Sequence, residues 1–228
     1  MKIILRLGGH VVWNEVLTPN VSILKEYSEV LKKAHDEGHI IHIVIGGGPP
    51  SRAYINALTH LNASNALKDY VGAMIARANA YLIACALGEL AHIPIPKNFS
   101  EVMDAIGKGK IVICGGLQPA QSTLAVAALL AELINADYLV NATTVDGVYT
   151  DDPKKNPNAK RLDKITISEL RKILRDRFMP GTYELFDELS LEILLRSKIK
   201  AVVLDGRNPD NVYKLLQGER VGTLIIPQ

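Results

Sequence analysis

The chain has 228 residues and a mass of 24.9 kDa, with 48% hydrophobic and 22% charged residues. This composition excludes disordered, collagen-like and disulfide-stapled classes, because apolar burial can offset the chain entropy lost on folding. The 26 Lys and Arg against 24 Asp and Glu leave a net charge of +2, too small for the basic stripe of a nucleic-acid-binding protein. Any anionic partner must therefore be held locally, and no nucleic-acid partner is expected.

The cysteines and the apolar segments bear on compartment. Cys85 and Cys114 form neither a CxxC pair nor a metal-ligand spacing, and both are expected to be buried free thiols. No run reaches about 18 uninterrupted apolar residues, and Met1 leads directly into KIILRLGG without a long apolar segment. We therefore expect a cytoplasmic protein with no membrane partner. The six histidines are scattered, which argues against a metal cluster.

Short aliphatic runs alternate with longer helical patterns along the chain, which is typical of an α/β fold. The first strand is expected at 2–7, and the first helix at about 20–37, where apolar residues recur at helical spacing and Gly38 supplies a stop. Segments 71–90 and 123–134 are helical and apolar nearly all round, so each should lie between layers or against another subunit. Further strands are expected at 40–45, 110–114, 138–142 and 200–204.

The last third of the chain carries clear helix-start signals. Thr166 and Glu169 form a capping box that predicts a helix through about Asp176, and Asn208 with Pro209 opens another. Before them, DDPKKNPNAKRL at 151–162 is interpreted as an ordered loop or flap. No linker divides the chain, so we expect one domain over 1–228 with two halves, about 1–135 and about 136–228.

Four glycine clusters follow aliphatic strands: Gly8-Gly9, Gly46-Gly47-Gly48, Gly115-Gly116 and the Asp146-Gly147 turn. The carboxyl ends of parallel strands share one edge, where glycine lets backbone amides approach an anion. Each cluster alone fits a tight turn equally well, but four together favour a site for several phosphates. Walker, GxGxxG, HExxH, GxSxG and kinase HRD motifs do not occur in the sequence.

The order of these motifs resembles the amino acid kinase superfamily, and within it the archaeal-type uridylate kinases. The resemblance covers almost the whole chain, and the TTVDGVYTDDP and GGLQPAQST blocks are its most specific parts. The segments that carry it are RLGGH at 6–10, IGGGPPSRAYI at 45–55, DYVG at 69–72, ARANAYL at 76–82, CGGLQPAQST at 114–123, ATTVDGVYTDDP at 142–153, and SKIKAVVLDG and GTLI near the end.

This resemblance implies a fold, an activity and a site. The fold is a three-layer αβα sandwich with a mainly parallel sheet, whose N-terminal half holds UMP and C-terminal half holds ATP. The activity is Mg²⁺-dependent phosphorylation of UMP to UDP by ATP, in a homo-hexamer built from dimers. The implied catalytic cations are Arg6 and Arg52. The implied ATP-binding residues are Arg6, Gly8, Gly9, His10, Gly48, Arg52, Thr143, Thr144, Tyr149 and Asp152. The implied UMP-binding residues are Gly47, Asp69, Leu117, Gln118, Pro119, Ala120, Gln121, Ser122 and Thr123.

The chain departs from the family pattern at a few positions. Many members have lysine at Arg6, serine or lysine at His10, asparagine at Thr144, and another pair at Pro49-Pro50. Arginine keeps the charge of lysine but presents a planar fork that can clamp two oxygens, so the rate is in question more than the reaction. His10 is open to a phosphate contact, a packing role or solvent exposure.

Other site candidates also have structural interpretations. Arg52 and Arg77 could each serve as a surface or interface salt-bridge partner, and Asp69 could favour a helix start. Two other functions stay open: a kinase of the same fold acting on another small phosphate, such as isopentenyl phosphate, or a nucleotide-sensing protein with little turnover. The first is disfavoured because GGGPPSR lacks the histidine expected there. The second is motivated by Arg6, His10 and Thr144.

Overall fold

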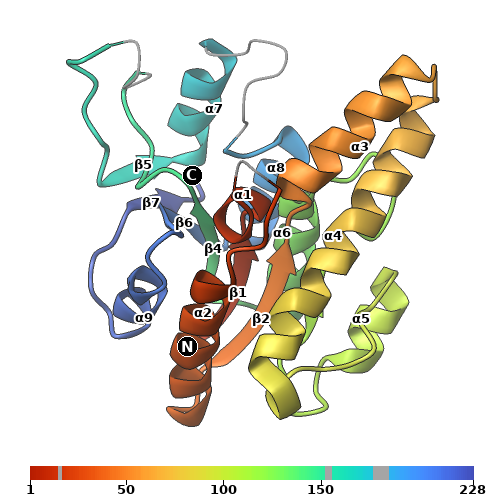
Figure 1. Cartoon of the computed structure of the whole chain (residues 1–228). Helices are drawn as coiled ribbons and strands as arrows, with labels where there is room; N and C mark the ends of the chain where they lie inside the picture. Colours follow the sequence, from red (N-terminus) through yellow and green to blue (C-terminus); the bar gives the residue numbers. More distant parts are fainter. Residues whose placement is uncertain (15–16, 152–155, 177–184) are drawn as a thin grey trace.

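A computed structural model describes residues 1–14, 17–151, 156–176 and 185–228, and these form an α/β fold around a single sheet (Figure 1). The described strands are ordered β3-β2-β1-β4-β6-β7-β5, and every neighbouring pair is parallel except β6 with β7. The strands are β1 (Lys2–Leu7), β2 (Ile40–Ile45), β3 (Ile113–Cys114), β4 (Tyr138–Thr143), β5 (Lys164–Thr166), β6 (Lys200–Asp205) and β7 (Thr223–Ile226).

Helices cover both faces of this sheet, which confirms the three-layer αβα sandwich. The helices are α1 (Gly9–Val12), α2 (Val21–Asp36), α3 (Gly48–His60), α4 (Asn65–Leu87), α5 (Phe99–Ala105), α6 (Thr123–Ile134), α7 (Ile167–Asp176), α8 (Glu188–Ser197) and α9 (Asp210–Leu216). One core packs the first face against α2, α4 and α9, and the other packs the second face against α6 and α8. In Figure 1, α2 and α4 lie in front of β1 and β2.

Strand alternation decides which face each β1 residue joins. Ile3, Leu5 and Leu7 belong to the core under α2 and α4, whereas Ile4 belongs to the core under α6 and α8. Successive side chains of a strand point to opposite faces, so Arg6 lies on the Ile4 side, toward α6. This placement becomes important at the site.

Most predicted helix boundaries are confirmed within a few residues. The α2 helix begins after Asn20, whose side chain accepts from Ile23 N, and Gly38 adopts φ +83° just beyond its end. The Thr166–Glu169 capping box forms as predicted: Thr166 N donates to Glu169 Oε2 at 2.8 Å and Glu169 N donates to Thr166 Oγ1 at 3.1 Å. The late helix α9 begins at Asp210, one residue after Pro209, where the sequence placed its start.

The predicted strand at 110–114 is wrong in its first part. Only Ile113 and Cys114 pair with β2, whereas Ile111 forms a bridge with Ala91 in the segment that follows α4. The buried ring of His42 holds the residue between them, because its Nδ1 accepts a hydrogen bond from Val112 N at 3.0 Å. The start of the run therefore pairs with a neighbour that no local pattern could identify.

Helix α4 begins at Asn65, six residues earlier than predicted, and ends at Leu87, three residues earlier than predicted. Among the described residues, 65–90 is long and apolar enough to cross a membrane by length and composition alone. However, Ala76, Ala80 and Ile83 are buried against the sheet core, as in a core helix of a globular domain. The prediction that both cysteines are buried is wrong for Cys85, which is exposed on α4, because this helix has an uncovered face.

Candidate functional site

The buried arginine Arg6 marks the carboxyl edge of the two central strands. It is 8% exposed, and its Nη1 donates to Asn141 Oδ1 while its Nη2 donates to Thr123 Oγ1, both at 3.3 Å. Its guanidinium also lies against two glycines, since a Cβ on Gly8 or Gly46 would fall 3.4 or 3.2 Å from an Nη atom. A buried charge needs polar neighbours, and the chain supplies them from β4 and α6.

The glycine loops after β1 and β2 pack directly on each other. A Cβ placed on Gly9 would lie 2.3 Å from Gly48 N and 2.7 Å from Gly46 O, so only glycine fits. Gly48 adopts φ +62°, a left-handed conformation that glycine takes at little cost. The predicted convergence of these two loops at one sheet edge is therefore confirmed by the geometry.

Not every glycine cluster has the predicted freedom to bind an anion. Gly8 N donates to Ala142 O at 2.8 Å and continues the β1–β4 ladder, so this amide is already engaged. The glycines Gly115 and Gly116 instead allow α4 to pack closely on the loop after β3, where a Cβ on Gly115 would lie 2.4 Å from Ala76 C. Gly147 likewise makes room for Thr223 Oγ1. Two of the four clusters thus serve close packing.

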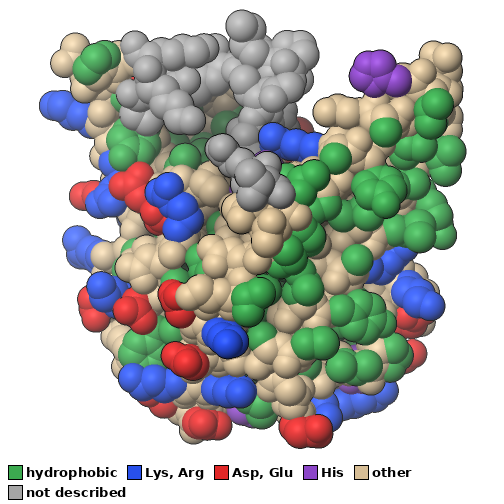
Figure 2. Space-filling view, in the orientation of Figure 1, with side chains coloured by type: hydrophobic (Ala, Val, Ile, Leu, Met, Phe, Trp, Pro, Cys, Tyr) green, Lys and Arg blue, Asp and Glu red, His purple; other side chains and the backbone are tan. Residues whose placement is uncertain are grey.

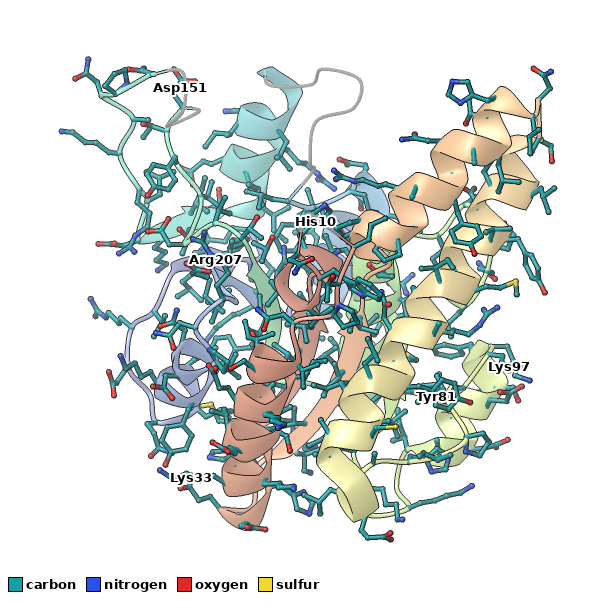
Figure 3. All side chains as sticks on the ribbon, viewed as in Figure 1. His10, Lys33, Tyr81, Lys97, Asp151 and Arg207 are labelled. Carbon is teal, nitrogen blue, oxygen red and sulfur yellow. The ribbon has the colours of Figure 1, made fainter. Side chains whose placement is uncertain are left out.

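Two further basic groups stand near Arg6 at this edge. His10 lies in α1 and Arg52 in α3, and Figure 3 places His10 at the upper centre of the molecule, beside α3. Burial, then the positive charges of Arg52 and Arg6, hold the pKa of His10 below its usual range. This shift favours the neutral imidazole, and an anion bound here would raise the pKa of His10 again.

A pocket of about 380 Å³ opens between α3, α4 and the loop before α6. Asp69 stands at its wall and accepts a hydrogen bond from Ala120 N at 3.0 Å. Ala120 adopts φ +58°, which costs about 1 kcal/mol in a residue other than glycine. The pocket is lined by Gly47, Ser51, Ile55, Asp69, Gly72, Ala73, Ala76, Gly116, Ala120, Gln121, Ser122 and Thr123.

The structure thus brings together most of the residues expected to bind UMP. Gly47, Asp69 and the run 120–123 line the pocket, whereas Leu117, Gln118 and Pro119 belong to the same loop but not to the lining. Leu117 packs instead against the core under α6. Gly48, assigned to the phosphates, faces Gly9 across the loop contact and not this pocket.

The residues expected to contact ATP lie in the C-terminal half, beyond β4. Thr143 is buried at the end of β4 and Thr144 after it is exposed. The hydroxyl of Tyr149 donates to Asp146 Oδ1 at 2.9 Å, a bond that raises the pKa of this phenol. Asp146 also accepts from Arg161, so it has a structural role in this turn. The expected ATP contact Asp152 lies outside the described residues.

Several site residues were not assigned a role from the sequence. Asn141 holds the Arg6 guanidinium on one side and donates to Leu185 O at 2.9 Å on the other. Arg77 Nη1 donates to the O atom of Gly116, a pocket-lining residue, at 2.9 Å. The Asp187 side chain accepts from Ser122 Oγ at 2.5 Å. Polar residues at buried positions were the available signal, but their partners are distant in sequence.

The described residues contain no group of three or more His, Cys, Asp or Glu side chains that could hold a metal ion. A protein-built metal cage therefore does not fit the part of the chain that is described. Mg²⁺ often reaches an enzyme already bound to nucleotide phosphates and keeps several waters, so a dedicated cage is not required for it.

Paired glycine loops around a buried arginine, beside a pocket of nucleotide size, are the features that a small-molecule phosphotransferase requires. Residues 1–205 match the amino acid kinase family, and the chain belongs to that family. A protein of Methanobrevibacter smithii named uridylate kinase is 40% identical over 227 residues, which cover 99% of each chain. Another of the same name from Metallosphaera sedula is 42% identical over 88% of this chain and 90% of its own.

Solved structures agree with these relationships. The crystal structure of uridylate kinase from Archaeoglobus fulgidus superposes with a TM-score of 0.86 at 37% identity, over 99% of this chain and 100% of that one. The structure of UMP kinase from Bacillus anthracis superposes with a TM-score of 0.82 over 100% of this chain and 96% of that one, at 23% identity, and shows the shared fold alone.

Proposed function

We propose that this chain is a UMP kinase, which transfers the γ-phosphoryl group of ATP to UMP and releases UDP and ADP. The observation that carries the proposal is the pocket of Asp69 and residues 120–123, which opens beside the buried Arg6 and the paired glycine loops. Relatives about 40% identical over nearly the whole chain bear the name uridylate kinase, which supports the same acceptor.

The geometry of the pocket and the glycine loops supports a division of roles among the site residues. Asp69 lines the pocket and is proposed to accept hydrogen bonds from the ribose hydroxyls, and the amides and side chains of 120–123 are proposed to distinguish uracil from cytosine. Arg6 and Arg52 contribute positive charge where the transferred group gains negative charge in the transition state. Phosphoryl transfer needs little covalent chemistry from the protein, so in-line placement by the glycine loops is the main contribution.

ATP is proposed to occupy the C-terminal half, near Thr143, Thr144 and Tyr149, with its phosphates directed toward Gly9 and Gly48. Mg²⁺ is proposed to enter with ATP, and when bound it would neutralise charge on the phosphate oxygens. Burial and the nearby cations Arg52 and Arg6 lower the pKa of His10, which favours its neutral form. It can donate one N–H to a phosphate oxygen without a net charge.

An assay of ADP release tests the acceptor directly. UMP, CMP, isopentenyl phosphate, carbamate and an amino acid are compared at equal concentration, with and without Mg²⁺. Among these acceptors, we expect efficient turnover only of UMP, and only when Mg²⁺ is present. Equal rates with CMP would contradict the uracil assignment, and efficient turnover of isopentenyl phosphate would favour the sister kinase. Nucleotide binding without any turnover would favour a sensing protein.

We also propose a cytoplasmic homo-hexamer assembled from dimers through the outer face of α4. Apolar side chains gather on α3 and α4, on the right side of Figure 2, and include Tyr54, Leu61, Leu67, Tyr70, Met74 and Tyr81, each at least 43% exposed. Contiguous apolar surface of this kind is usual in contacts between subunits. Light scattering at micromolar concentration should show an oligomer, and a monodisperse monomer would contradict the proposal.

A further inference from the structure

Asn79 is the polar residue in the middle of α4 that the proposed mechanism does not use. It is 2% exposed, and its side chain makes three hydrogen bonds to two other parts of the chain. Its Nδ2 donates to Gly46 O at 2.8 Å and to Gly47 O at 3.1 Å, and its Oδ1 accepts from Trp13 Nε1 at 2.9 Å. A buried amide with every contact made to a loop of the site is unusual for a residue that only packs.

The chemistry of the three partners leaves no alternative side chain of this size. The indole N–H only donates, so the group that faces Trp13 must be an acceptor. The carbonyls of Gly46 and Gly47 only accept, so the group that faces them must donate two hydrogens. A carboxylate has no donor and a hydroxyl has only one, so asparagine alone meets all three requirements.

The two carbonyl contacts also orient the amides of the glycine loop. In a trans peptide the C=O of one residue and the N–H of the next point in opposite directions. When α4 holds the carbonyls of Gly46 and Gly47, the N–H groups of Gly47 and Gly48 are turned away from α4. In agreement, Gly48 N lies against Gly9, within 2.3 Å of where a Cβ on Gly9 would stand.

Trp13 connects the same asparagine to the other phosphate-facing loop. Trp13 follows α1, the short helix that begins at Gly9 and includes His10. Its backbone N–H donates to Gly9 O at 3.1 Å. The indole therefore ties the end of that turn to α4, and Asn79 ties α4 to the loop after β2. The side chain of Asn79 therefore fixes the position of the Gly9 turn relative to the Gly46–Gly48 loop.

We propose that Asn79 is a positioning residue that sets the Gly46–Gly48 amides against the Gly9 turn for phosphoryl transfer, with Trp13 as its second anchor. The inference rests on the proposed kinase function. It assigns no substrate contact to Asn79, which acts through the backbone of the glycine loop. Its removal should therefore affect the transfer step more than the affinity for the acceptor.

Two variants separate the donor contacts of the Asn79 side chain from its acceptor contact. Asn79→Asp keeps the acceptor for Trp13 but loses both donors to the glycine carbonyls, and it should lower kcat about 10- to 100-fold with a small change in KM for UMP. Trp13→Phe loses the indole donor and keeps the carbonyl contacts, so its kcat should fall by only about two- to fivefold. The indole contacts the mutated side chain, so far-UV circular dichroism and cooperative urea unfolding are used to show that Asn79→Asp is folded.

Ser28→Ala is the matched control for stability. Ser28 lies in α2 and is 5% exposed, and its Oγ donates to Ala86 O at 2.7 Å. The variant therefore removes a side-chain hydrogen bond to the C-terminal end of α4, the helix that contains Asn79. Urea unfolding should show a lower free energy of unfolding in each variant, but Ser28→Ala should keep the parent kcat. The role of Asn79 is refuted if Asn79→Asp retains kcat within about threefold of the parent, or if Ser28→Ala lowers kcat as much.

The parent enzyme separates this inference from the proposed function. Parent turnover with UMP tests the function alone. The ratio of variant to parent kcat, measured with whichever acceptor the parent phosphorylates, tests the role of Asn79. If Asn79→Asp does not fold, Asn79→Ala carries the test, because it loses all three hydrogen bonds without burying a charge, and kcat within about threefold of the parent refutes the role of Asn79. A Trp13→Phe enzyme with the parent kcat and the parent KM overturns the second anchor.

Discussion

The contact between Gly9 and the second glycine loop leads to a quantitative prediction for Gly9→Ala. The added Cβ would lie 2.3 Å from Gly48 N and 2.5 Å from Gly48 Cα. Ordinary contacts of a methyl group are about 3.4 Å or longer, so the two loops must separate by about 1 Å. Backbone atoms face the methyl group on this side, so no flexible side chain can move aside to relieve the contact.

A displacement of this size should be costly for transfer. Misplacement of reacting groups by about 1 Å costs up to about 100-fold in rate, so we expect kcat of Gly9→Ala to fall by about that factor. The overpacking should also reduce the free energy of unfolding by about 1–3 kcal/mol. Steady-state kinetics at saturating UMP and ATP measure the first effect, and urea unfolding measures the second.

Gly38→Ala is the control that separates strain from placement. Gly38 adopts φ +83° after α2, and apart from its two chain neighbours no heavy atom of the described residues lies within 4 Å of the position that an added methyl group would take. Alanine there adds backbone strain of about 1 kcal/mol without any new contact. We expect lower stability with unchanged kcat. A Gly9→Ala enzyme within about threefold of the parent kcat would refute the argument that these loops must stay in contact for transfer.

Three further predictions follow from single side chains. Arg6→Ala should lower kcat by a factor equivalent to about 2.7–4 kcal/mol while UMP binding, measured by calorimetry, changes little; turnover within about threefold of the parent would remove Arg6 from the mechanism. Asp69→Asn should raise the KM for UMP about tenfold with a smaller effect on kcat, and an unchanged KM would contradict its assignment to the acceptor. Burial lowers the pKa of His42 from 6.5 to about 4, and its neutral Nδ1 accepts from Val112 N. Protonation therefore favours the unfolded chain, and His42 should lower the free energy of unfolding by about 3 kcal/mol from pH 7 to pH 4, a contribution that His42→Gln should remove in urea titrations.

Local patterns were sufficient to predict the elements whose ends are set by their own residues. The capping box at Thr166 and Glu169 and the start of α2 at Asn20 depend on hydrogen bonds within one turn, so a short stretch of sequence contains all the necessary groups. The alternation of short aliphatic runs with helices was likewise enough to predict an α/β fold. The family motifs then added the predicted activity and six of the twelve residues that line the pocket.

Partners that are distant in sequence decided the rest. The strand predicted at 110–114 is shortened because Ile111 pairs with Ala91, and Cys85 is exposed because one face of α4 has no cover among the described residues. Neither fact can be derived from the composition of the run or of the helix itself. Each depends on which surface the folded chain places against it.

The glycine clusters show the same division within the site. The sequence by itself determined that glycines end the strands at one edge, since the strand pattern and the glycine positions are local properties. Only the tertiary structure decided their roles: Gly9 and Gly48 meet, whereas Gly115 makes room for α4. Asn79 was visible as a polar residue on an apolar helix, but its function depends on two carbonyls more than thirty residues away. A side chain's hydrogen-bonding capacity is local, whereas the groups that satisfy it are brought together only by the fold.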